Sequence, residues 1–254
     1  MMKAMIFAAG LGTRLKPITD TLPKALVPVA GKPLIEHVCH KLKKAGIEEA
    51  VVNVHHFADK VEEWVADQQI MSLQISDERE GLLETGGAVL HAREYLKDCG
   101  RFLIHNVDIL SNLDLGWFES SAAPDAMASL LVSRRETSRM LLFDPKTMRL
   151  VGWYNSSTGQ IRSPYEDVDP DKCLAFAFSG IHIMSDKIFE PMMTYAQKYN
   201  LTQDDSSPRF SIIDFYLWAC AEYNISGVLA EDLELVDVGK LDTLAVAEEF
   251  ILFS

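Results

Sequence analysis

The sequence predicts an α/β fold: a Rossmann-like, mostly parallel (mixed) sheet with helices on both faces, to which an insertion of antiparallel strands is added. In the first half, short apolar runs alternate with segments of helical periodicity, as parallel strands do with their crossover helices. Between residues 126 and 184, strand-like runs follow one another without an intervening helical pattern, and this favours antiparallel pairing.

The first half supplies the parallel strands and their helices. Residues 4–9 form an apolar run of strand length, which Gly10 and Gly12 end. A helix is predicted to begin at Pro33, because helices accept proline in their first turn, and to stop at Gly46. The patterns that follow predict a strand at 50–54, a helix at 59–65, a strand at 73–76, a helix at 87–96 and a strand at 101–107.

The second half is richer in strands. They are predicted at 128–133, 140–143, 150–154 and 174–184. Ser211 is expected to cap a helix over 212–222, and two short strands (225–230 and 234–238) and a helix (241–250) follow. Residues 155–172 are rich in Ser, Pro, Asp and Gly, so we expect a mobile surface loop there, with a lid over a binding site as the alternative.

The charge balance excludes some classes of partner. Lys and Arg number 24 and Asp and Glu number 37, which gives a formal net charge of −13. Such a surface disfavours nonspecific binding to nucleic acid or to an anionic membrane. The four cysteines form no C-x-x-C pair, and the chain shows neither a signal-peptide pattern nor an apolar run of membrane-spanning length. These features predict a cytoplasmic protein with reduced thiols.

The glycine-rich turn after the first strand has the properties of a phosphate-binding loop. Glycines leave backbone N–H groups free to approach phosphate oxygens, while Arg14 and Lys24 add two cations. The turn lacks the Gly-Lys-Ser/Thr of a P-loop and the third glycine of a dinucleotide fingerprint. We therefore predict binding of a nucleoside triphosphate, with backbone contacts from Ala8, Ala9, Gly10, Gly12 and Thr13.

Two carboxylates stand at the ends of apolar strands. Asp108 follows the strand at 101–107, and Asp237 closes the short strand at 234–238. A carboxylate without a partner is costly at such a position, and magnesium is commonly held by few carboxylates together with phosphate oxygens and water. The sequence thus predicts Mg²⁺ bound by Asp108 and Asp237.

These motifs together resemble the signature of the sugar-phosphate nucleotidyltransferases, and most closely the short enzymes acting on N-acetylmuramate, mannose or heptose 1-phosphates. The resemblance is carried by G-x-G-T-R at 10–14, by P-K-x-L-x-P-V-x-G-K-P at 23–33, by L-E-T-G-G at 83–87 and by F-S-G-I at 178–181. It implies transfer of a nucleoside monophosphate from a triphosphate (UTP or GTP favoured) to a sugar 1-phosphate, with release of pyrophosphate. It also implies a chain without a β-helix tail.

The resemblance assigns roles to further residues. Arg14 would hold the β- and γ-phosphates, and Lys24 would contact the α-phosphate and the sugar phosphate, so both are expected to be catalytic. The base and ribose would lie on a turn between a strand and a helix, made of Glu84, Thr85, Gly86 and Gly87. The sugar phosphate would contact Asn106, Ser179 and Gly180.

The chain departs from the family pattern at a few positions and leaves alternatives open. Val107 replaces a usual glycine, and Lys240 replaces a threonine. We expect one domain over residues 1–254, with a nucleotide-binding half (1–125) and a sugar-binding half (126–254), and a possible homodimer. The alternatives are a cytidylyltransferase for phosphocholine or a similar phosphorylated alcohol, in which Trp153 and Tyr154 could help to form an aromatic cage, and a non-catalytic regulatory protein of the same fold. An NAD-dependent enzyme fits poorly, because the second strand ends in Asn53-Val54-His55 without an acidic residue.

Overall fold

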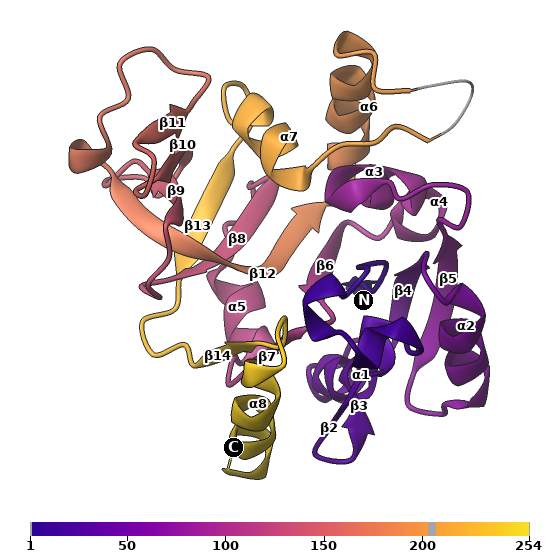
Figure 1. The fold of residues 1–254 in the computed structure, drawn as a ribbon. Helices are drawn as coiled ribbons and strands as arrows, with labels where there is room; N and C mark the ends of the chain where they lie inside the picture. The colour runs from indigo at the N-terminus through magenta and orange to yellow at the C-terminus, as the bar shows by residue number, and fades with distance from the viewer. Residues whose placement is uncertain (1, 203–206, 254) are drawn as a thin grey trace.

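The computed structural model describes residues 2–202 and 207–253, which are arranged around one mixed sheet (Figure 1). The sheet has ten strands in the order β11-β10-β9-β12-β6-β1-β4-β5, with β8 pairing with β12 and β13 pairing with β8. The predicted α/β fold is therefore confirmed.

The parallel part is formed by the first half of the chain. Its strands are β1 (Lys3–Phe7), β4 (Glu49–Val54), β5 (Ser72–Asp77) and β6 (Arg101–Asn106), with β1 paired in parallel to both β4 and β6. The helices along this part are α1 (Leu34–Lys44), α2 (Ala58–Asp67), α3 (Glu84–His91) and α4 (Arg93–Leu96). Gly46 follows α1 with φ +79°, a conformation that favours glycine, so this predicted helix stop is confirmed.

The antiparallel part is built on the long strand β12 (Leu174–Ser185). β12 pairs antiparallel with β6, with β8 (Ala128–Ser133) and with β9 (Arg139–Phe143), so it joins the two halves of the sheet. β10 (Leu150–Asn155), β11 (Gln160–Arg162) and β13 (Ile225–Leu229) complete it. The predicted strands of this half agree with the observed ones to within one or two residues, except that β11 was not expected.

The segment 155–172 is more regular than the sequence indicated. Residues 160–162 form β11, so the prediction of a loop is wrong there. The Tyr165 hydroxyl donates a hydrogen bond to the carbonyl of Cys220 at 2.7 Å, and Arg162 forms an ion pair with Asp214 on α7 (Ile212–Ala219). The segment is thus attached to the outside of α7.

Several short elements were not predicted. Asp114 caps α5 (Leu115–Ser121) by accepting hydrogen bonds from two backbone N–H groups, and α6 (Phe189–Lys198) follows β12. Two ribbons lie outside the main sheet, β2 (Pro28–Val29) with β3 (Lys32–Pro33) and β7 (Ile109–Ser111) with β14 (Leu235–Asp237). Of these four strands only β14 was predicted, at 234–238. The last described helix is α8 (Asp242–Phe253).

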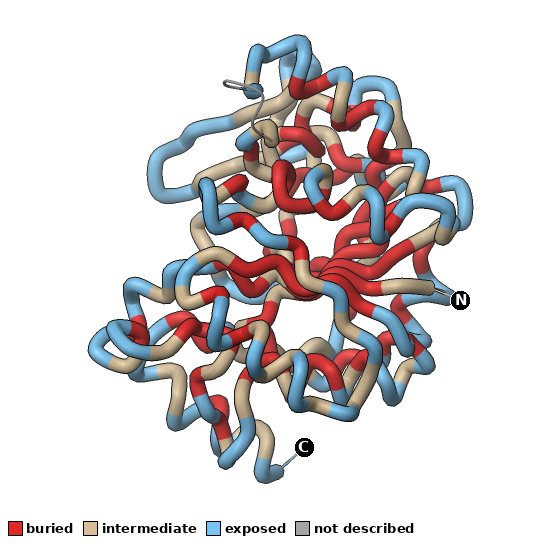
Figure 2. The backbone as a smooth tube through the Cα atoms, turned by 90° about the vertical axis from the view of Figure 1, so that its right-hand side faces the viewer, coloured by how far each residue is buried: buried red, intermediate tan, exposed pale blue. Residues whose placement is uncertain are grey.

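Helices cover both faces of the sheet, as predicted. One hydrophobic core includes residues of α1, α2, α5 and α8, and the other includes residues of α3, α4, α6 and α7. Figure 2 shows the sheet as a buried band between these two layers. Within the described residues, no helix is long and apolar enough to cross a membrane.

Candidate active site

A cavity of about 570 Å³ opens at the carboxyl edge of β1, β4 and β6. Crevices at this edge are the usual ligand sites of open α/β sheets. The cavity is lined by ten of the residues that the sequence predicted for the site, namely Ala9, Gly10, Gly12, Thr13, Arg14, Lys24, Glu84, Thr85, Asn106 and Asp108. The other predicted site residues do not line it: Ala8, Gly86, Gly87, Ser179, Gly180 and Asp237.

The glycine-rich turn forms one wall of this cavity. Gly12 has φ +60°, and a Cβ there would stand 2.8 Å from the Thr19 methyl group, so both the backbone angle and the space favour glycine. Its carbonyl accepts hydrogen bonds from the Thr19 hydroxyl and from the backbone of Leu15, both at 2.8 Å. Gly10 and Arg14 remain exposed. The hydrogen bonds to the Gly12 carbonyl therefore hold the turn in place, while the Arg14 side chain stays accessible to a ligand.

Lys24 and Asp108 form an ion pair inside the cavity. The Lys24 side chain is 9% exposed and the Asp108 side chain 20%, so the pair is largely withdrawn from water. Each of these charges supplies the other's counterion. A phosphate group in the cavity can offer Lys24 a second anionic partner, and a cation can do the same for Asp108.

The ribbon of β7 and β14 brings the backbones of the two predicted metal ligands, Asp108 and Asp237, next to each other. In this ribbon Asp237 lies opposite Ile109, and the backbone N–H of Val238 donates to the carbonyl of Asp108 at 2.8 Å. A Cβ added to Gly239 would stand 2.7 Å from Asp237 Oδ1 and 2.8 Å from Arg14 Nη2. Gly239 thus leaves the space that the Asp237 carboxylate and the Arg14 guanidinium occupy beside it.

The floor of the cavity contains a buried polar pair that the sequence analysis missed. Asn53 Oδ1 accepts a hydrogen bond from the Ala8 backbone at 2.8 Å, and Asn53 Nδ2 donates to Glu78 at 2.7 Å. Glu78 also accepts from the backbone of Leu83 at 3.3 Å. Burial raises the pKa of the Glu78 carboxyl, and the hydrogen bonds from Asn53 and Leu83 oppose that rise. Asn53 and Glu78 therefore link the start of the phosphate loop to the start of α3.

The Glu84–Gly87 motif is helical, which corrects the predicted turn between a strand and a helix. It forms the first turn of α3. A Cβ on Gly86 would stand 2.4 Å from the Phe210 ring, and one on Gly87 would stand 2.1 Å from the Pro208 carbonyl oxygen. These two glycines are thus needed for packing against residues 208–210, while Glu84 and Thr85 face the cavity. A role of all four residues in nucleotide binding stays a prediction.

The predicted sugar-side residues lie behind Asn106. Gly180 has φ +74° in a bulge of β12, and a Cβ there would stand 2.7 Å from the Asn106 side-chain nitrogen. The Ser179 hydroxyl is buried and has no hydrogen-bond partner among the described residues. Gly180 therefore sets the position of the Asn106 amide, which does line the cavity.

Comparison with known proteins agrees with this geometry. The family model described as nucleotidyl transferase matches residues 3–139. A relative from Caulobacter vibrioides, named N-acetylmuramate alpha-1-phosphate uridylyltransferase, is 34% identical over 91% of this chain and 89% of its own. The chain belongs to the nucleotidyl transferase family. A Neisseria meningitidis relative of the same name is 44% identical over 44% of this chain and 49% of its own.

Solved structures share the fold of this nucleotidyl transferase. HddC from Yersinia pseudotuberculosis, in complex with GMP-PN, matches with a TM-score of 0.72 and 22% identity over 99% of this chain and all of its own. A putative glucose-1-phosphate thymidylyltransferase from Bacillus anthracis matches with a TM-score of 0.77 and 18% identity over all of this chain and 96% of its own. The family match and the Caulobacter relative, rather than these structures, confirm the predicted class, an enzyme that transfers a nucleotidyl group to a sugar 1-phosphate.

The donor set of this nucleotidyl transferase fits a divalent cation that also binds phosphate. Enzymes of the family typically use a divalent metal. No group of three or more His, Cys, Asp or Glu side chains is arranged to hold a metal within residues 2–202 and 207–253. Asp108 and Asp237, which β7 and β14 bring together, are two hard oxygen donors, and phosphate oxygens of a substrate can complete such a set.

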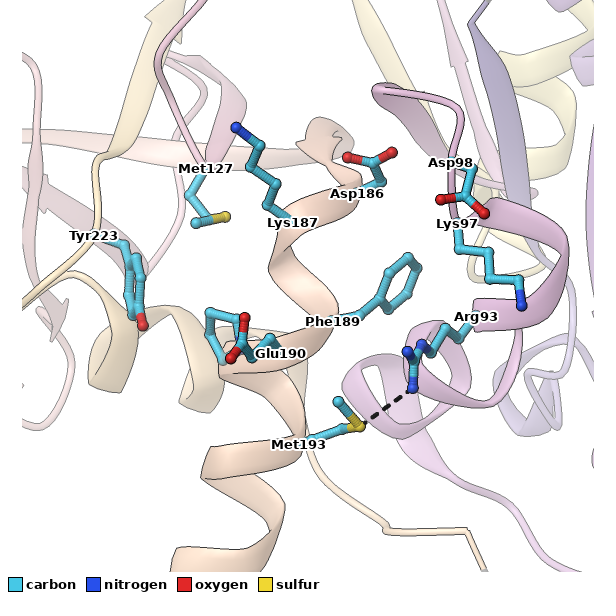
Figure 3. Close-up of a pocket in the computed structure, with 11 residues that line it drawn as sticks. Arg93, Lys97, Asp98, Met127, Asp186, Lys187, Phe189, Glu190, Met193 and Tyr223 are labelled. Carbon is cyan, nitrogen blue, oxygen red and sulfur yellow. Dashed lines mark hydrogen bonds between the residues drawn. The ribbon is translucent and has the colours of Figure 1, made fainter.

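A second depression, of about 480 Å³, lies between α4 and α6 and contains none of the predicted site residues (Figure 3). Its side chains include Lys97, Lys187, Asp98 and Asp186, which carry both signs of charge and point in different directions in the figure. Arg93 there donates to the Met193 sulfur at 3.4 Å. This depression has no set of groups converging on one point, so the chemistry belongs to the cavity at the carboxyl edge.

Proposed function

We propose that this nucleotidyl transferase transfers a uridylyl group from UTP to N-acetylmuramate 1-phosphate, giving a nucleotide sugar and pyrophosphate. The proposal is carried by one observation: the chain is similar along 91% of its length to a uridylyltransferase named for that acceptor. The cavity supports it, because the glycine turn, Arg14, Lys24 and Asp108 line it, and the backbone of Asp237 lies next to that of Asp108 in the ribbon of β7 and β14. Such a product is a precursor for the cell envelope.

The reaction needs positioning and charge compensation rather than a protein nucleophile. An oxygen of the acceptor phosphate forms a bond to the α-phosphorus of UTP, and the bond to the bridging oxygen of pyrophosphate breaks. Arg14 and the N–H groups of the glycine turn hold the β- and γ-phosphates and stabilise the leaving pyrophosphate. Lys24 leaves its ion pair with Asp108 and binds the α-phosphate and the acceptor phosphate, which places the two reactants side by side.

Magnesium is the metal we propose for this site. Asp108 and Asp237 would hold it, and its charge would neutralise the phosphate oxygens. As Lys24 moves to the phosphates, the Asp108 carboxylate becomes free to accept the cation. Lys24 and Asp108 would therefore neutralise each other in the empty site and would bind the phosphates and the cation in the loaded site.

Base and sugar are proposed to lie on opposite sides of the triphosphate. Ala8 to Thr13 would bind the phosphates, and the first turn of α3, Glu84 to Gly87, would bind the uridine. Asn106 would contact the acceptor phosphate, with Ser179 and Gly180 behind it. In this arrangement residues 1–125 form the nucleotide-binding half and 126–254 the sugar-binding half of one domain. The enzyme would act in the cytoplasm, where its triphosphate is made, as a monomer or a homodimer.

The other candidate functions are less well supported. A quaternary ammonium such as that of phosphocholine calls for an aromatic cage. Among the described residues that line the cavity, Phe7 is the only aromatic one, and the Arg162 guanidinium covers the Trp153 ring at 5.6 Å from its centroid. A non-catalytic regulatory role does not require the Lys24–Asp108 pair or its approach to Asp237.

Release of pyrophosphate tests the proposal. Four nucleoside triphosphates would be crossed with N-acetylmuramate, N-acetylglucosamine, mannose, glucose and heptose 1-phosphates and with phosphocholine, at saturating Mg²⁺. We expect release that requires UTP and N-acetylmuramate 1-phosphate together. Lys24→Met should lower this turnover by about 10²–10³-fold, because it removes a positioned cation. The exposed Lys16→Met is the matched control. A different preferred pair would refute the substrate assignment, and silence with intact nucleotide binding would favour a regulatory protein.

A further inference from the structure

The loop that follows β8 lies at the same edge of the sheet as the active-site cavity. β8 is antiparallel to β12, and β12 is antiparallel to β6, which itself runs parallel to β1. The carboxyl ends of β8 and β1 therefore point the same way. Arg135, two residues beyond the end of β8, lies at this edge in the proposed sugar-binding half.

Arg135 has no carboxylate partner among the described residues. Its one hydrogen bond there is from Nη2 to the Phe178 carbonyl, at 3.5 Å, which is the limit for such a bond. Four other arginines, Arg79, Arg134, Arg162 and Arg209, do form ion pairs with carboxylates. The guanidinium of Arg135 is thus loosely held and exposed, with most of its donors unused.

The neighbouring arginine is bound differently. Arg134 forms an ion pair with Glu231 at 2.9 Å and lies over the Phe176 ring at 5.2 Å from its centroid. Its charge is compensated and its position fixed. Both arginines line a depression of about 390 Å³ with Ser133, Thr137 and Ala177. Of the two, Arg135 is the cation available to a ligand that enters this depression.

The backbone of β12 connects this depression to the active-site cavity. Phe178, whose carbonyl Arg135 contacts, is two residues from Gly180, a spacing of roughly 7 Å along an extended strand. Gly180 packs against Asn106, and Asn106 lines the active-site cavity. A pyranose ring whose phosphate lies near Asn106 can therefore extend a side group toward Arg135.

We propose that Arg135 binds the carboxylate of an acidic sugar 1-phosphate and so sets the acceptor specificity. This inference rests on the proposed function and makes it more specific. N-Acetylmuramate differs from N-acetylglucosamine only by a lactyl ether, which carries a carboxylate. The planar guanidinium of arginine binds a carboxylate through two parallel, charge-assisted hydrogen bonds. Its interaction with a neutral hydroxyl is much weaker.

The two sugar phosphates provide a test in which the acceptors differ only at the predicted contact. kcat/KM would be measured with saturating UTP for both acceptors in the wild type, in Arg135→Ala and in Arg135→Lys. We expect the ratio of the two values, N-acetylmuramate over N-acetylglucosamine, to fall about 10- to 100-fold in Arg135→Ala, as for loss of a charged hydrogen bond. Arg135→Lys should keep part of the preference, because it keeps the charge without the planar fork. Arg101→Ala, at the opposite end of β6, removes the same charge and should keep the wild-type ratio.

Each outcome separates the two levels of the argument. An unchanged ratio in Arg135→Ala, with wild-type turnover of N-acetylmuramate 1-phosphate, overturns the role of Arg135 and leaves the proposed function intact. A wild type that uses neither acceptor overturns both. Calorimetric binding of the two uridine diphosphate sugars gives a second readout, in which only the acidic product should lose affinity on Arg135→Ala. Equal losses for both products would show a structural role instead.

Discussion

Replacement of Asn53 by alanine should destabilise the protein more than the same replacement of an exposed asparagine. Asn53 and Glu78 are 4% and 3% exposed, so water cannot easily replace their hydrogen bonds. Asn53→Ala leaves the buried Ala8 N–H without an acceptor, which costs about 1–3 kcal/mol of stability. It also removes the hydrogen bond to the Glu78 carboxylate, which contributes about 1.5–3 kcal/mol. We therefore expect the free energy of unfolding to fall by about 3–5 kcal/mol, a large fraction of the 5–15 kcal/mol typical of a domain.

The assay is urea unfolding at 25 °C and pH 7.5, with the KM for the triphosphate measured on the same samples. That KM should rise, because Ala8 begins the phosphate loop. Asn112→Ala is the matched control, since Asn112 also accepts and donates one hydrogen bond each, at 3.0 and 3.1 Å, but in an exposed position. Asn112→Ala should lower the free energy of unfolding by less than about 1 kcal/mol. If Asn53→Ala costs no more than this control, the buried pair does not support the loop and the reasoning is wrong.

Three further predictions concern the sugar side, acid stability and metal binding. Gly180→Ala should lower the stability by about 1–2 kcal/mol because Gly180 has φ +74°, and it should also raise the KM for the acceptor. The control is Gly159→Ala: Gly159 has φ +71° but a Cβ there would meet no atom within 4 Å, so only the stability should change. Burial lowers the pKa of His182 to about 3, so the folded state keeps it neutral, and stability is lost as pH falls below about 6.5. His182 alone should account for about 2 kcal/mol of the stability lost between pH 7.5 and 5, and His105, whose pKa burial lowers to about 4, adds a separate loss. In urea unfolding, His182→Phe should therefore lose about 2 kcal/mol less than the wild type over this range; an unchanged pH dependence would contradict the assignment. Asp237→Asn should raise the Mg²⁺ concentration for half-maximal turnover at least tenfold, as loss of a charged ligand would, while a similar rise in Asp232→Asn would show a nonspecific charge effect.

The parallel half and the glycine turn that ends β1 could be predicted because their signals are local, while the phosphate-binding role of that turn stays a prediction. An apolar run that ends in glycines, or a helix with its own stop at Gly46, needs no information from the rest of the chain. The same holds for the long strands of the second half. α6 was missed because Pro191, in its first turn, resembles a break in the pattern.

What could not be predicted depends on partners far along the chain. β7 is three residues long and exists because β14 pairs with it. Gly86 and Gly87 suggested close approach of a ligand, but their neighbours are Phe210 and Pro208. Such partners leave no local pattern.

One signal for the missed polar pair was present in the sequence. Asn53 interrupts an otherwise apolar strand, and a buried amide there demands partners. Glu78 gave no signal of its own, since it lies in a run of charged residues that is typical of a solvated surface. Its burial follows from contacts with distant parts of the chain, the Asn53 amide and the Leu83 backbone.

The ribbon of β7 and β14 also has a consequence for synthesis on the ribosome. The phosphate loop, Lys24 and Asp108 are translated early, but the strand that carries Asp237 and the adjoining Gly239 wall comes 124 or more residues after β7. At 5–20 residues per second this interval lasts roughly ten seconds. During that time the nascent chain carries Lys24 and Asp108 but lacks Asp237, the second carboxylate of the proposed metal site. With the roles proposed above, catalytic competence is therefore a late event that requires nearly the whole chain.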